Sequence, residues 1–399
     1  MNKIRLAGRI GRIKPSSTLA VEARANELKA QGKSIISLGT GEPDFDTPSH
    51  IKDAAVCAIS DGATKYTAVD GTPALKQAVI NKFKRENQLN FSADQILVSA
   101  GGKQSFFNLA QALLEKGDEV VIPAPYWVSY PDMVLLADAT PVIVPAGIQQ
   151  GYKITPDQLD AVIGFQTKLV VLNSPSNPTG AVYTRHELAA LGEVLRKYPD
   201  VLIATDDMYE HILWSSEPFC NIANACPDLL ERTIVLNGVS KAYAMTGWRI
   251  GYAAGPRALV AAMKKVQSQS TSNPASISQA AAVAALDGDQ SCIAPMVQSF
   301  KERHDYTVAR LNQLHGVRCL PNQGTFYAFA LFKDAIANFE GISNDAEMAE
   351  LILNEAGVAL VPGSAFGAEG YMRISYATSR DNLDQALDRL EKLLGRTNR

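Results

Sequence analysis

Residues 240–252 read Ser240-Lys241-Ala242-Tyr243-Ala244-Met245-Thr246-Gly247-Trp248-Arg249-Ile250-Gly251-Tyr252. Lys241 follows a β-branched run, Thr233–Leu236, that predicts a strand, and Arg249 lies eight residues after the lysine. A lysine that forms a Schiff base needs a neutral amine, which burial and cationic neighbours promote. An arginine offers paired donors that match the oxygens of a phosphate. On their own these two cations are more typical of a solvated surface, so a role in catalysis depends on the rest of the chain.

Five further motifs occur along the chain. They are Ala100-Gly101-Gly102-Lys103-Gln104, Pro125-Tyr126-Trp127, Asn177-Pro178-Thr179-Gly180, Asp206 with Tyr209 in Thr-Asp-Asp-Met-Tyr-Glu, and Met372-Arg373-Ile374-Ser375-Tyr376. Together with them, residues 240–252 resemble the lysine signature of the class I and II aminotransferases, which use pyridoxal 5'-phosphate. Order and spacing match from Lys14 to the end of the chain. The chain is most similar to the bacterial aspartate aminotransferase subgroup Ib, which includes aspartate/prephenate aminotransferases.

The resemblance implies how the chain would hold the ring of the cofactor. Lys241 would form the Schiff base, and the buried carboxylate of Asp206 would keep the ring nitrogen protonated. The alternative for Asp206 is a helix N-cap. Asn177 and Tyr209 would hydrogen-bond the phenolic oxygen, and Trp127 would stack on the ring. Lys241, Asp206 and Tyr209 are the predicted catalytic residues.

The phosphate of the cofactor would lie where a helix begins. Backbone N–H groups of Gly102 and Lys103 would bind it, assisted by the helix dipole, by Arg249 and by Ser240. By resemblance, Tyr66 would reach the phosphate of a second subunit, which implies a homodimer with shared active sites.

One position departs from the wider fold. Many enzymes of this fold carry serine three residues before the lysine, where this chain has Gly238. Subgroup Ib tolerates a residue other than serine there, and Ser240 is the candidate substitute.

The substrate would be held mainly by Arg373, whose forked donors match an α-carboxylate. Gly41 would contact the substrate through its backbone, because only glycine allows so close an approach. A plain turn before a proline is the alternative for Gly41. Asn177 and Trp127 are also expected at the substrate.

Two lysines bear on which substrate is used. In subgroup Ib, a lysine matching Lys103 is linked to the side-chain carboxylate of acidic substrates, which favours aspartate and glutamate. Lys14 matches a lysine linked in some members to the use of prephenate, or is one more charge in a basic N-terminal arm.

The predicted reaction is ping-pong transfer of an amino group to a 2-oxo acid, oxaloacetate or 2-oxoglutarate. A lyase of the same fold would share most of these residues but would release pyruvate and ammonia. A non-catalytic sensor module of a transcription regulator would need a winged-helix domain, for which there is no room before Lys14. A dinucleotide-dependent dehydrogenase is disfavoured because no Gly-x-Gly-x-x-Gly follows the first strands.

The predicted fold class is α/β, because short apolar runs alternate with helical patterns and favour a mostly parallel sheet. The resemblance implies fold type I of the pyridoxal-phosphate-dependent transferases. The expected strands are Gln95–Ser99, Glu119–Ile122, Leu169–Leu172, Val201–Ala204, Thr233–Leu236 and Ile250–Ala253, and the helices between them include Lys103–Leu114 and His186–Leu195. We expect a large domain at residues 48–286 and a smaller α+β domain from residues 1–47 with 287–399.

The smaller domain is predicted from a change of pattern in the last third of the chain. The expected helices are Ala280–Leu286, Gln298–Leu314, Ala346–Glu355 and Asn382–Leu394, and the expected strands are Gly324–Leu331 and Met372–Tyr376. The N-terminal segment lacks a core of its own, so we expect it to pack on this domain or on a partner subunit.

Composition narrows the classes of partner. The chain has 399 residues and a net charge of −3, which disfavours nucleic acid. Five scattered cysteines without C-x-x-C spacing favour a reducing, cytoplasmic location. His186 and His211 have no metal-ligand spacing with each other or with a nearby acid pair, so we expect surface or packed histidines and no metal. There is no run of eighteen apolar residues, so we expect no membrane span.

Overall fold

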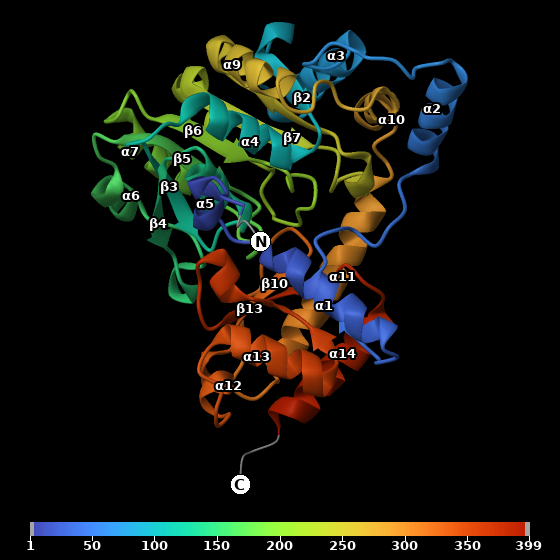
Figure 1. The fold of residues 1–399 in the computed structure, drawn as a ribbon, viewed down its shortest axis with the longest axis vertical. Coiled ribbons are helices and arrows are strands. Elements are labelled where there is room, and N and C mark those ends of the chain that lie inside the picture. The colour runs from blue at the N-terminus through green and yellow to red at the C-terminus, as the bar shows by residue number, and fades with distance from the viewer. Residues whose placement is uncertain (1–3, 396–399) are drawn as a thin grey trace.

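The structure is a computed structural model that describes residues 4–395. A seven-stranded sheet forms the upper part of the molecule in Figure 1, in the order β2-β8-β7-β6-β5-β3-β4. Only β8 runs antiparallel to its neighbours, so the predicted mostly parallel sheet is confirmed. The strands are β2 (Ile96–Ser99), β3 (Glu119–Ala124), β4 (Thr140–Pro145), β5 (Thr167–Asn173), β6 (Leu202–Asp206), β7 (Thr233–Gly238) and β8 (Gly251–Ala254).

Helices cover both faces of this sheet because its strands are apolar on both sides. Ile234 packs under the helices of one face and Val235 under those of the other, and both are buried. One face carries α4 (Gly102–Leu113), α5 (Ser129–Leu136) and α9 (Arg257–Ser268). The other carries α2 (Ser49–Ser60), α3 (Pro73–Lys82), α6 (Pro156–Val162), α7 (Arg185–Arg196), α8 (Ile222–Ala225) and α10 (Ser276–Asp287).

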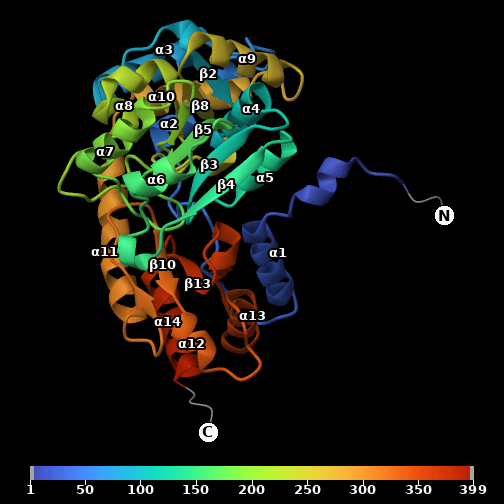
Figure 2. The ribbon, with the colours of Figure 1, turned by 90° about the vertical axis from the view of Figure 1, so that its left-hand side faces the viewer.

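The second part of the molecule lies below the first in Figure 1 and contains an antiparallel sheet in the order β12-β13-β10-β9. The long helix α11 runs from the upper part into it, as both views show (Figures 1 and 2). The strands of this sheet are β9 (Arg318–Cys319), β10 (Tyr327–Leu331), β12 (Val361–Pro362) and β13 (Tyr371–Ser375). The helices of the second part include α11 (Ile293–Leu311), α12 (Lys333–Ala337), α13 (Asp345–Leu351) and α14 (Arg380–Leu394).

The hydrophobic cores support the predicted division of the chain. Three buried clusters draw only on residues between Ile51 and Leu286, whereas the largest draws mainly on residues 36–38 and 296–394. We therefore propose a large domain at residues 48–286 and a smaller one from residues 1–47 with 287–399. Residues 1–3 and 396–399 of these ranges lie outside the described residues.

Among the elements that differ from those expected, two have shifted or divided ends and one strand was not predicted at all. The predicted strand Gly324–Leu331 begins only at Tyr327, because Thr325 has a left-handed backbone with φ of 69°. The predicted helix Ala346–Glu355 is α13 followed by a single π-helical turn, Ile352–Ala356. Strand β4 was not predicted, since it is an edge strand in which most side chains are exposed or half-buried.

The N-terminal segment packs on the second part, as expected. In α1 (Ser17–Ala30), Ala25 and Leu28 pack against Leu353 and Ala359. The short helix before it, Gly8–Arg12, contacts α5 and leads into the arm that projects from the body in Figure 2. No helix within residues 4–395 has both the length and the apolar character needed to cross a membrane.

The carboxyl ends of the neighbouring parallel strands β5, β6 and β7 lie at the same edge of the sheet. Strands β5 and β6 end at Asn173 and Asp206, and β7 ends at Gly238, three residues before Lys241. Sites in open α/β sheets form at such ends. The fold therefore carries the predicted motifs to the boundary between the two parts.

Candidate active site

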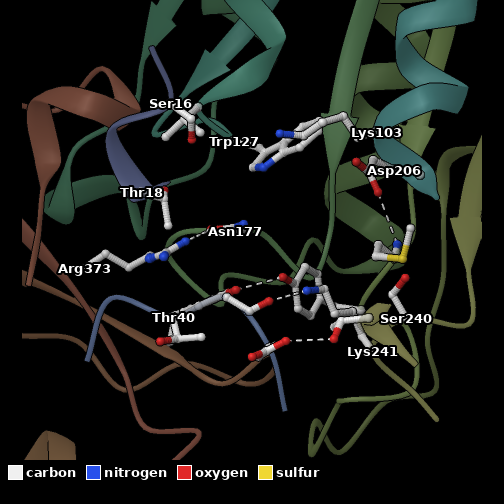
Figure 3. A pocket seen from close by; sticks show the side chains of 18 of the residues that line it. Ser16, Thr18, Thr40, Lys103, Trp127, Asn177, Asp206, Ser240, Lys241 and Arg373 are labelled. Carbon is white, nitrogen blue, oxygen red and sulfur yellow. Dashed lines mark hydrogen bonds between the residues drawn. The ribbon is translucent and has the colours of Figure 1, made fainter. Parts of the chain in front are cut away.

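A cavity of about 490 Å³ opens at this boundary. Figure 3 shows Lys241 and Asp206 on one side of it and Arg373 on the other. The structure brings most of the predicted site residues together here. Those that line the cavity are Gly41, Gly102, Lys103, Trp127, Asn177, Asp206, Tyr209, Ser240, Lys241, Arg249 and Arg373.

Lys241 enters the cavity from the loop after β7. Its Nζ donates a hydrogen bond to the carbonyl of Gly41 and lies 5.7 Å from the ring centre of Tyr209. Burial, followed by the charge of Arg373, lowers the pKa of Lys241 to about 8. A fraction of Lys241 is therefore a neutral amine near neutral pH, as a nucleophilic lysine requires.

Asp206 is the last residue of β6 and turns its carboxylate to the cavity. Its Oδ2 accepts a hydrogen bond of 2.5 Å from the hydroxyl of Tyr130, and its Oδ1 accepts one of 3.3 Å from the backbone of Met208. Burial raises the pKa of Asp206, while the bond from Tyr130 opposes that rise. Asp207 does not line the cavity and instead accepts a bond of 2.7 Å from Asn221. The strand thus presents one of two adjacent carboxylates to the site.

Tyr209 and Asn177 offer neutral donors in the middle of the cavity. The hydroxyls of Tyr209 and Tyr327 are 3.0 Å apart, and burial followed by this neighbour raises the pKa of Tyr209 well above its ordinary value. Tyr209 therefore stays a phenol. The Oδ1 of Asn177 accepts a hydrogen bond of 3.0 Å from Arg373, which leaves its amide N–H groups as donors.

A corner rich in donors lies where α4 begins. A Cβ at Gly101, whose φ is 90°, would come within 2.2 Å of the Arg249 guanidinium. A Cβ at Gly251 would come within 2.3 Å of the backbone nitrogen of Gly102. Glycine at these positions therefore lets Arg249 and β8 close against the first turn of α4, whose N–H groups have no partner within the helix. The hydroxyl of Ser240 lies in the same lining.

Arg373 is a buried cation on the opposite side. It lies in β13 and is 2% exposed, and its guanidinium donates 2.7 Å to the carbonyl of Gly39 as well as 3.0 Å to Asn177. Its Nε is buried without a partner among the described residues. A buried guanidinium with an unsatisfied N–H is suited to receive an anion.

Lys103 and Trp127 form a further wall. The Nζ of Lys103 lies 5.2 Å from the ring centre of Trp127, within cation–π range. Burial, and then the charge of Arg249, lowers the pKa of Lys103. Arg373 and Lys103 are thus two separated cations in the cavity lining that could each bind an anion, in addition to the corner that contains Arg249.

Two predicted residues lie outside this cavity. Tyr66 is 93% exposed, so its expected role needs a second chain. Lys14 is exposed, and its backbone N–H donates 3.1 Å to Asp132. From the N-terminal region the lining instead includes Ser16, Thr18, Leu19 and Glu22.

Three further groups that were not predicted form hydrogen bonds at the site. Tyr327 pairs with Tyr209, and Glu42 accepts a hydrogen bond of 2.8 Å from Thr246. Tyr130 donates to Asp206 from behind the cavity wall. Tyr130 packs on the ring of Trp127, three residues before it in the chain, but no sequence signal reports its contact with Asp206.

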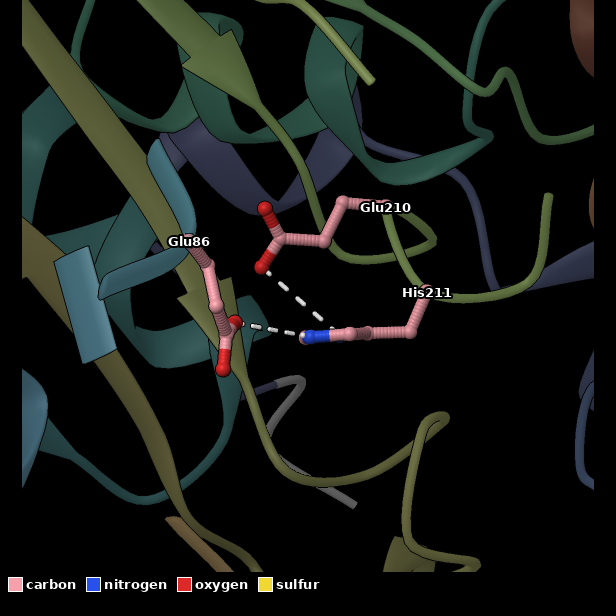
Figure 4. A group of neighbouring side chains, drawn as sticks. All are labelled: Glu86, Glu210 and His211. Carbon is pink, nitrogen blue, oxygen red and sulfur yellow. Dashed lines mark hydrogen bonds and ion pairs between the residues drawn. The ribbon is translucent and has the colours of Figure 1, made fainter. Parts of the chain in front are cut away.

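A second polar cluster lies behind the cavity wall. Potential ligand atoms of Glu86, Glu210 and His211 lie within 4.8 Å of one another (Figure 4). Sequence spacing does not indicate this cluster, because Glu86 comes close to His211 only through folding. The fully buried Lys82 contacts Glu210 and lies 3.6 Å from Glu86. Its ammonium group therefore supplies the positive charge that a metal ion would otherwise bring to these carboxylates. Although burial opposes it, the neighbouring His211 and Lys82 lower the pKa of Glu86 to about 2.

Sequence comparison places this architecture in a family. The family model for class I and II aminotransferases matches residues 33–390. The chain belongs to the class I and II aminotransferases. The aspartate/prephenate aminotransferase of Nitrosomonas europaea is 61% identical over 396 residues, which cover 98% of this chain and 100% of the relative. The aspartate aminotransferase of Rhizobium meliloti is 48% identical, over 97% of this chain and 95% of the relative.

Solved structures agree with this aminotransferase in fold. The crystal structure of the Rhizobium meliloti aspartate aminotransferase superposes with a TM-score of 0.95 at 47% identity, covering 99% of this chain and 100% of the other. The Thermus thermophilus aspartate aminotransferase with maleate gives a TM-score of 0.92 at 41% identity, covering 98% and 100%. The predicted family, fold class and enzyme class are therefore confirmed.

Proposed function

We propose that this aminotransferase uses pyridoxal 5'-phosphate, held on Lys241, to exchange an amino group between aspartate or glutamate and the matching 2-oxo acids. One observation carries the proposal. A half-buried lysine with a lowered pKa shares a cavity with the half-buried carboxylate of Asp206 and the buried, partly unsatisfied guanidinium of Arg373. These are an amine, an acid partner for a ring nitrogen, and a carboxylate receptor.

The residues present fit the phosphate by their donor chemistry. Arg249, the hydroxyl of Ser240 and the first-turn N–H groups of Gly102 and Lys103 meet in one corner of the cavity. No side chain intrudes there from position 101 or 102, because both are glycine. A dianion at this position would be met by the positive end of α4 as well as by the guanidinium.

The residues also fit a pyridine ring with a phenolic oxygen. Asp206 offers a carboxylate to the ring nitrogen, and Trp127 offers a flat apolar face. Asn177 and Tyr209 each retain a donor suited to the phenolic oxygen. Lys241 lies in the same lining, so we infer that its amine carries the cofactor.

When bound, the cofactor supplies an electron-poor ring that stabilises negative charge at the Cα of the substrate. Lys241 Nζ is the group placed to take the proton from Cα and to return one, since its pKa of about 8 lies near working pH. Tyr209 and Asn177 hold the orientation of the ring through hydrogen bonds. The amino group would stay with the cofactor when the amino acid leaves as its 2-oxo acid, and would pass to the second 2-oxo acid that enters afterwards, which gives ping-pong kinetics.

Two separated cations support acidic substrates. Arg373 Nε is free to bind the α-carboxylate, and Lys103 is the candidate for the side-chain carboxylate. A Cβ at Gly41 would come within 3.1 Å of the Tyr327 hydroxyl, so a side chain there would narrow the space beside Arg373. The names of the relatives point the same way, because they describe enzymes that act on aspartate.

We further propose prephenate as a 2-oxo substrate. The relative that is 61% identical carries that name, and Lys14 lies just before Ser16 and Thr18, which line the cavity. Incubation with prephenate and aspartate should yield arogenate. No arogenate at any enzyme concentration would reject this activity while leaving aspartate use intact.

A homodimer and a cytoplasmic location belong to the same proposal. Helix α2 exposes Val56 and Ile59, at 61% and 54%, and the exposed Tyr66 follows it. Such an apolar face beside Tyr66 supports a second copy that completes each site. The five free cysteines support a reducing compartment.

The assay for this function is direct. The chain loaded with pyridoxal 5'-phosphate should convert aspartate and 2-oxoglutarate into oxaloacetate and glutamate in equal amounts. Lys241→Ala should lose about 1,000-fold or more of the rate, because the proton carrier is gone, while remaining folded by circular dichroism. Release of pyruvate and ammonia without glutamate would instead indicate a lyase and contradict the proposal.

A further inference from the structure

Tyr130 contacts two of the proposed cofactor-binding residues from behind the cavity wall. It lies in the first turn of α5 and is 1% exposed. Its hydroxyl donates a hydrogen bond of 2.5 Å to Asp206 Oδ2. Its ring centre lies 5.1 Å from that of Trp127 at an angle of 82°, and 4.7 Å from that of Phe106. One side chain therefore touches both the carboxylate proposed for the ring nitrogen and the indole proposed to stack on the ring.

Tyr130 is the side-chain donor to Asp206 within residues 4–395. The other hydrogen bond to this carboxylate comes from the backbone of Met208 and is longer, at 3.3 Å. Tyr130 cannot move away easily, since Phe106 and Trp127 hold its ring on two sides. The carboxylate of Asp206 is thereby fixed by a buried donor that the substrate never touches.

The hydrogen bond also acts on the charge of Asp206. Burial raises the pKa of this carboxyl, and the bond from Tyr130 is the leading influence in the other direction. The charge of Lys241, on the same side of the cavity, also lowers this pKa, and Tyr209 is the other titratable group that faces Asp206. A donor to a carboxylate stabilises the ionised form and so lowers its affinity for a proton.

We propose that Tyr130 is a positioning residue that, by donating to Asp206, keeps the shared proton on the ring nitrogen of the cofactor and not on the carboxylate. The proposal rests on the proposed function, because it requires pyridoxal 5'-phosphate in this cavity. Without the bond, Asp206 competes more strongly for the proton that the two groups share. A ring nitrogen without its proton is a poorer electron sink.

The test is the ¹⁵N chemical shift of pyridoxal 5'-phosphate labelled at the ring nitrogen and bound to the full chain. This signal separates protonated from unprotonated pyridine and does not depend on turnover. Y130F removes the hydroxyl and keeps the ring that packs on Trp127. Its signal should move from the wild-type value towards the value of D206N. Y252F is the matched control, because Tyr252 is equally buried but lies in β8 and does not line the cavity.

Two further variants of the chain test the same proposal. The double variant Y130F with D206N should match D206N alone, since Tyr130 acts through Asp206. Replacement of Tyr130 by 3-fluorotyrosine, a stronger donor with the same ring, should move the signal in the opposite direction and keeps the test open if Y130F folds poorly. An unchanged signal in both position-130 proteins, with D206N shifted, overturns the proposal. No bound signal from the wild type contradicts the proposed function itself and the inference with it.

Discussion

Lys241 and Arg373 donate hydrogen bonds to backbone carbonyls two residues apart, those of Gly41 and Gly39. They reach this segment from different sheets, Lys241 from the loop after β7 and Arg373 from β13. The segment that follows β1 (Ile36–Ser37) therefore accepts hydrogen bonds from both cations, which reach it from opposite sides of the cavity. Their repulsion is the second cause, after burial, of the lowered pKa of Lys241.

Removing the charge of Arg373 should raise the pKa of Lys241. In the cofactor-free protein the neutral amine appears as the pH passes about 8. In Arg373→Met the midpoint should move up towards the ordinary value of 10.5, so less of Lys241 is neutral at pH 8. Labelling of Lys241 with an amine-reactive reagent at a series of pH values, read by mass spectrometry, measures the midpoint. Arg257→Met, at an exposed ion pair with Asp94, is the control, and a midpoint that stays in place for Arg373→Met would refute the electrostatic account.

Lys103 should matter for dicarboxylic substrates only. Lys103→Met keeps the backbone N–H at the start of α4 and removes the proposed partner of the side-chain carboxylate. The kcat/KM for aspartate should fall by about 10- to 100-fold, the value of one hydrogen bond to a charged group. The much lower activity with alanine should stay within about twofold of the wild type, because alanine lacks that carboxylate. Lys116→Met, at an exposed position after α4, is the control, and an equal loss for both substrates would contradict this role.

Serine at position 238 should destabilise the protein. A Cβ at Gly238 would lie 2.9 Å from the carbonyl oxygen of Ile250 and 3.1 Å from the Cα of Gly251, and both neighbours are backbone. We expect Gly238→Ser to lower the free energy of unfolding by about 1–3 kcal/mol, as overpacking does. Urea unfolding measures it. Gly247→Ser, where a Cβ would meet no atom within 4 Å, should be near neutral, and equal stability of the two variants would show that crowding does not exclude a side chain at 238.

The buried pair of Lys82 and Glu210 should behave as a unit. Lys82→Met leaves the carboxylate of Glu210 buried, with the neutral Asn87 and Asn237 at hydrogen-bond distance and His211 at 3.7 Å. The cost should be about 3–5 kcal/mol in the free energy of unfolding. Lys82→Met combined with Glu210→Gln should recover most of that loss in urea unfolding. A double variant as unstable as the single one would mean that side-chain packing, and not charge pairing, stabilises the cluster.

The parts of the site that could be predicted lie within local motifs. Asp206 lies in a motif of Thr205 to Glu210 that resembles those of the family, and its position at the end of β6 directs its carboxylate to the cavity, whereas that of Asp207 just after the strand is directed elsewhere. The Gly-Gly pair at 101 and 102 predicted a helix start because glycine permits the positive φ found at Gly101.

The parts that could not be predicted depend on chain segments far apart in sequence. Tyr130 meets Asp206 across 76 residues, and His211 meets Glu86 across 125. No periodicity reports such pairs. The left-handed backbone of Thr325, which delays the start of β10, could not be predicted for a different reason. It is imposed by the surroundings of Thr325, and threonine has no intrinsic preference for this conformation.

The central claim, that Lys241 carries pyridoxal 5'-phosphate, is tested most directly by borohydride reduction of the loaded protein followed by peptide mapping. The account predicts loss of the visible absorption band and a pyridoxyl label on the peptide that contains Lys241, with the band absent from Lys241→Ala. A label confined to another lysine, such as Lys103, or a protein that takes up no label at all, would contradict it.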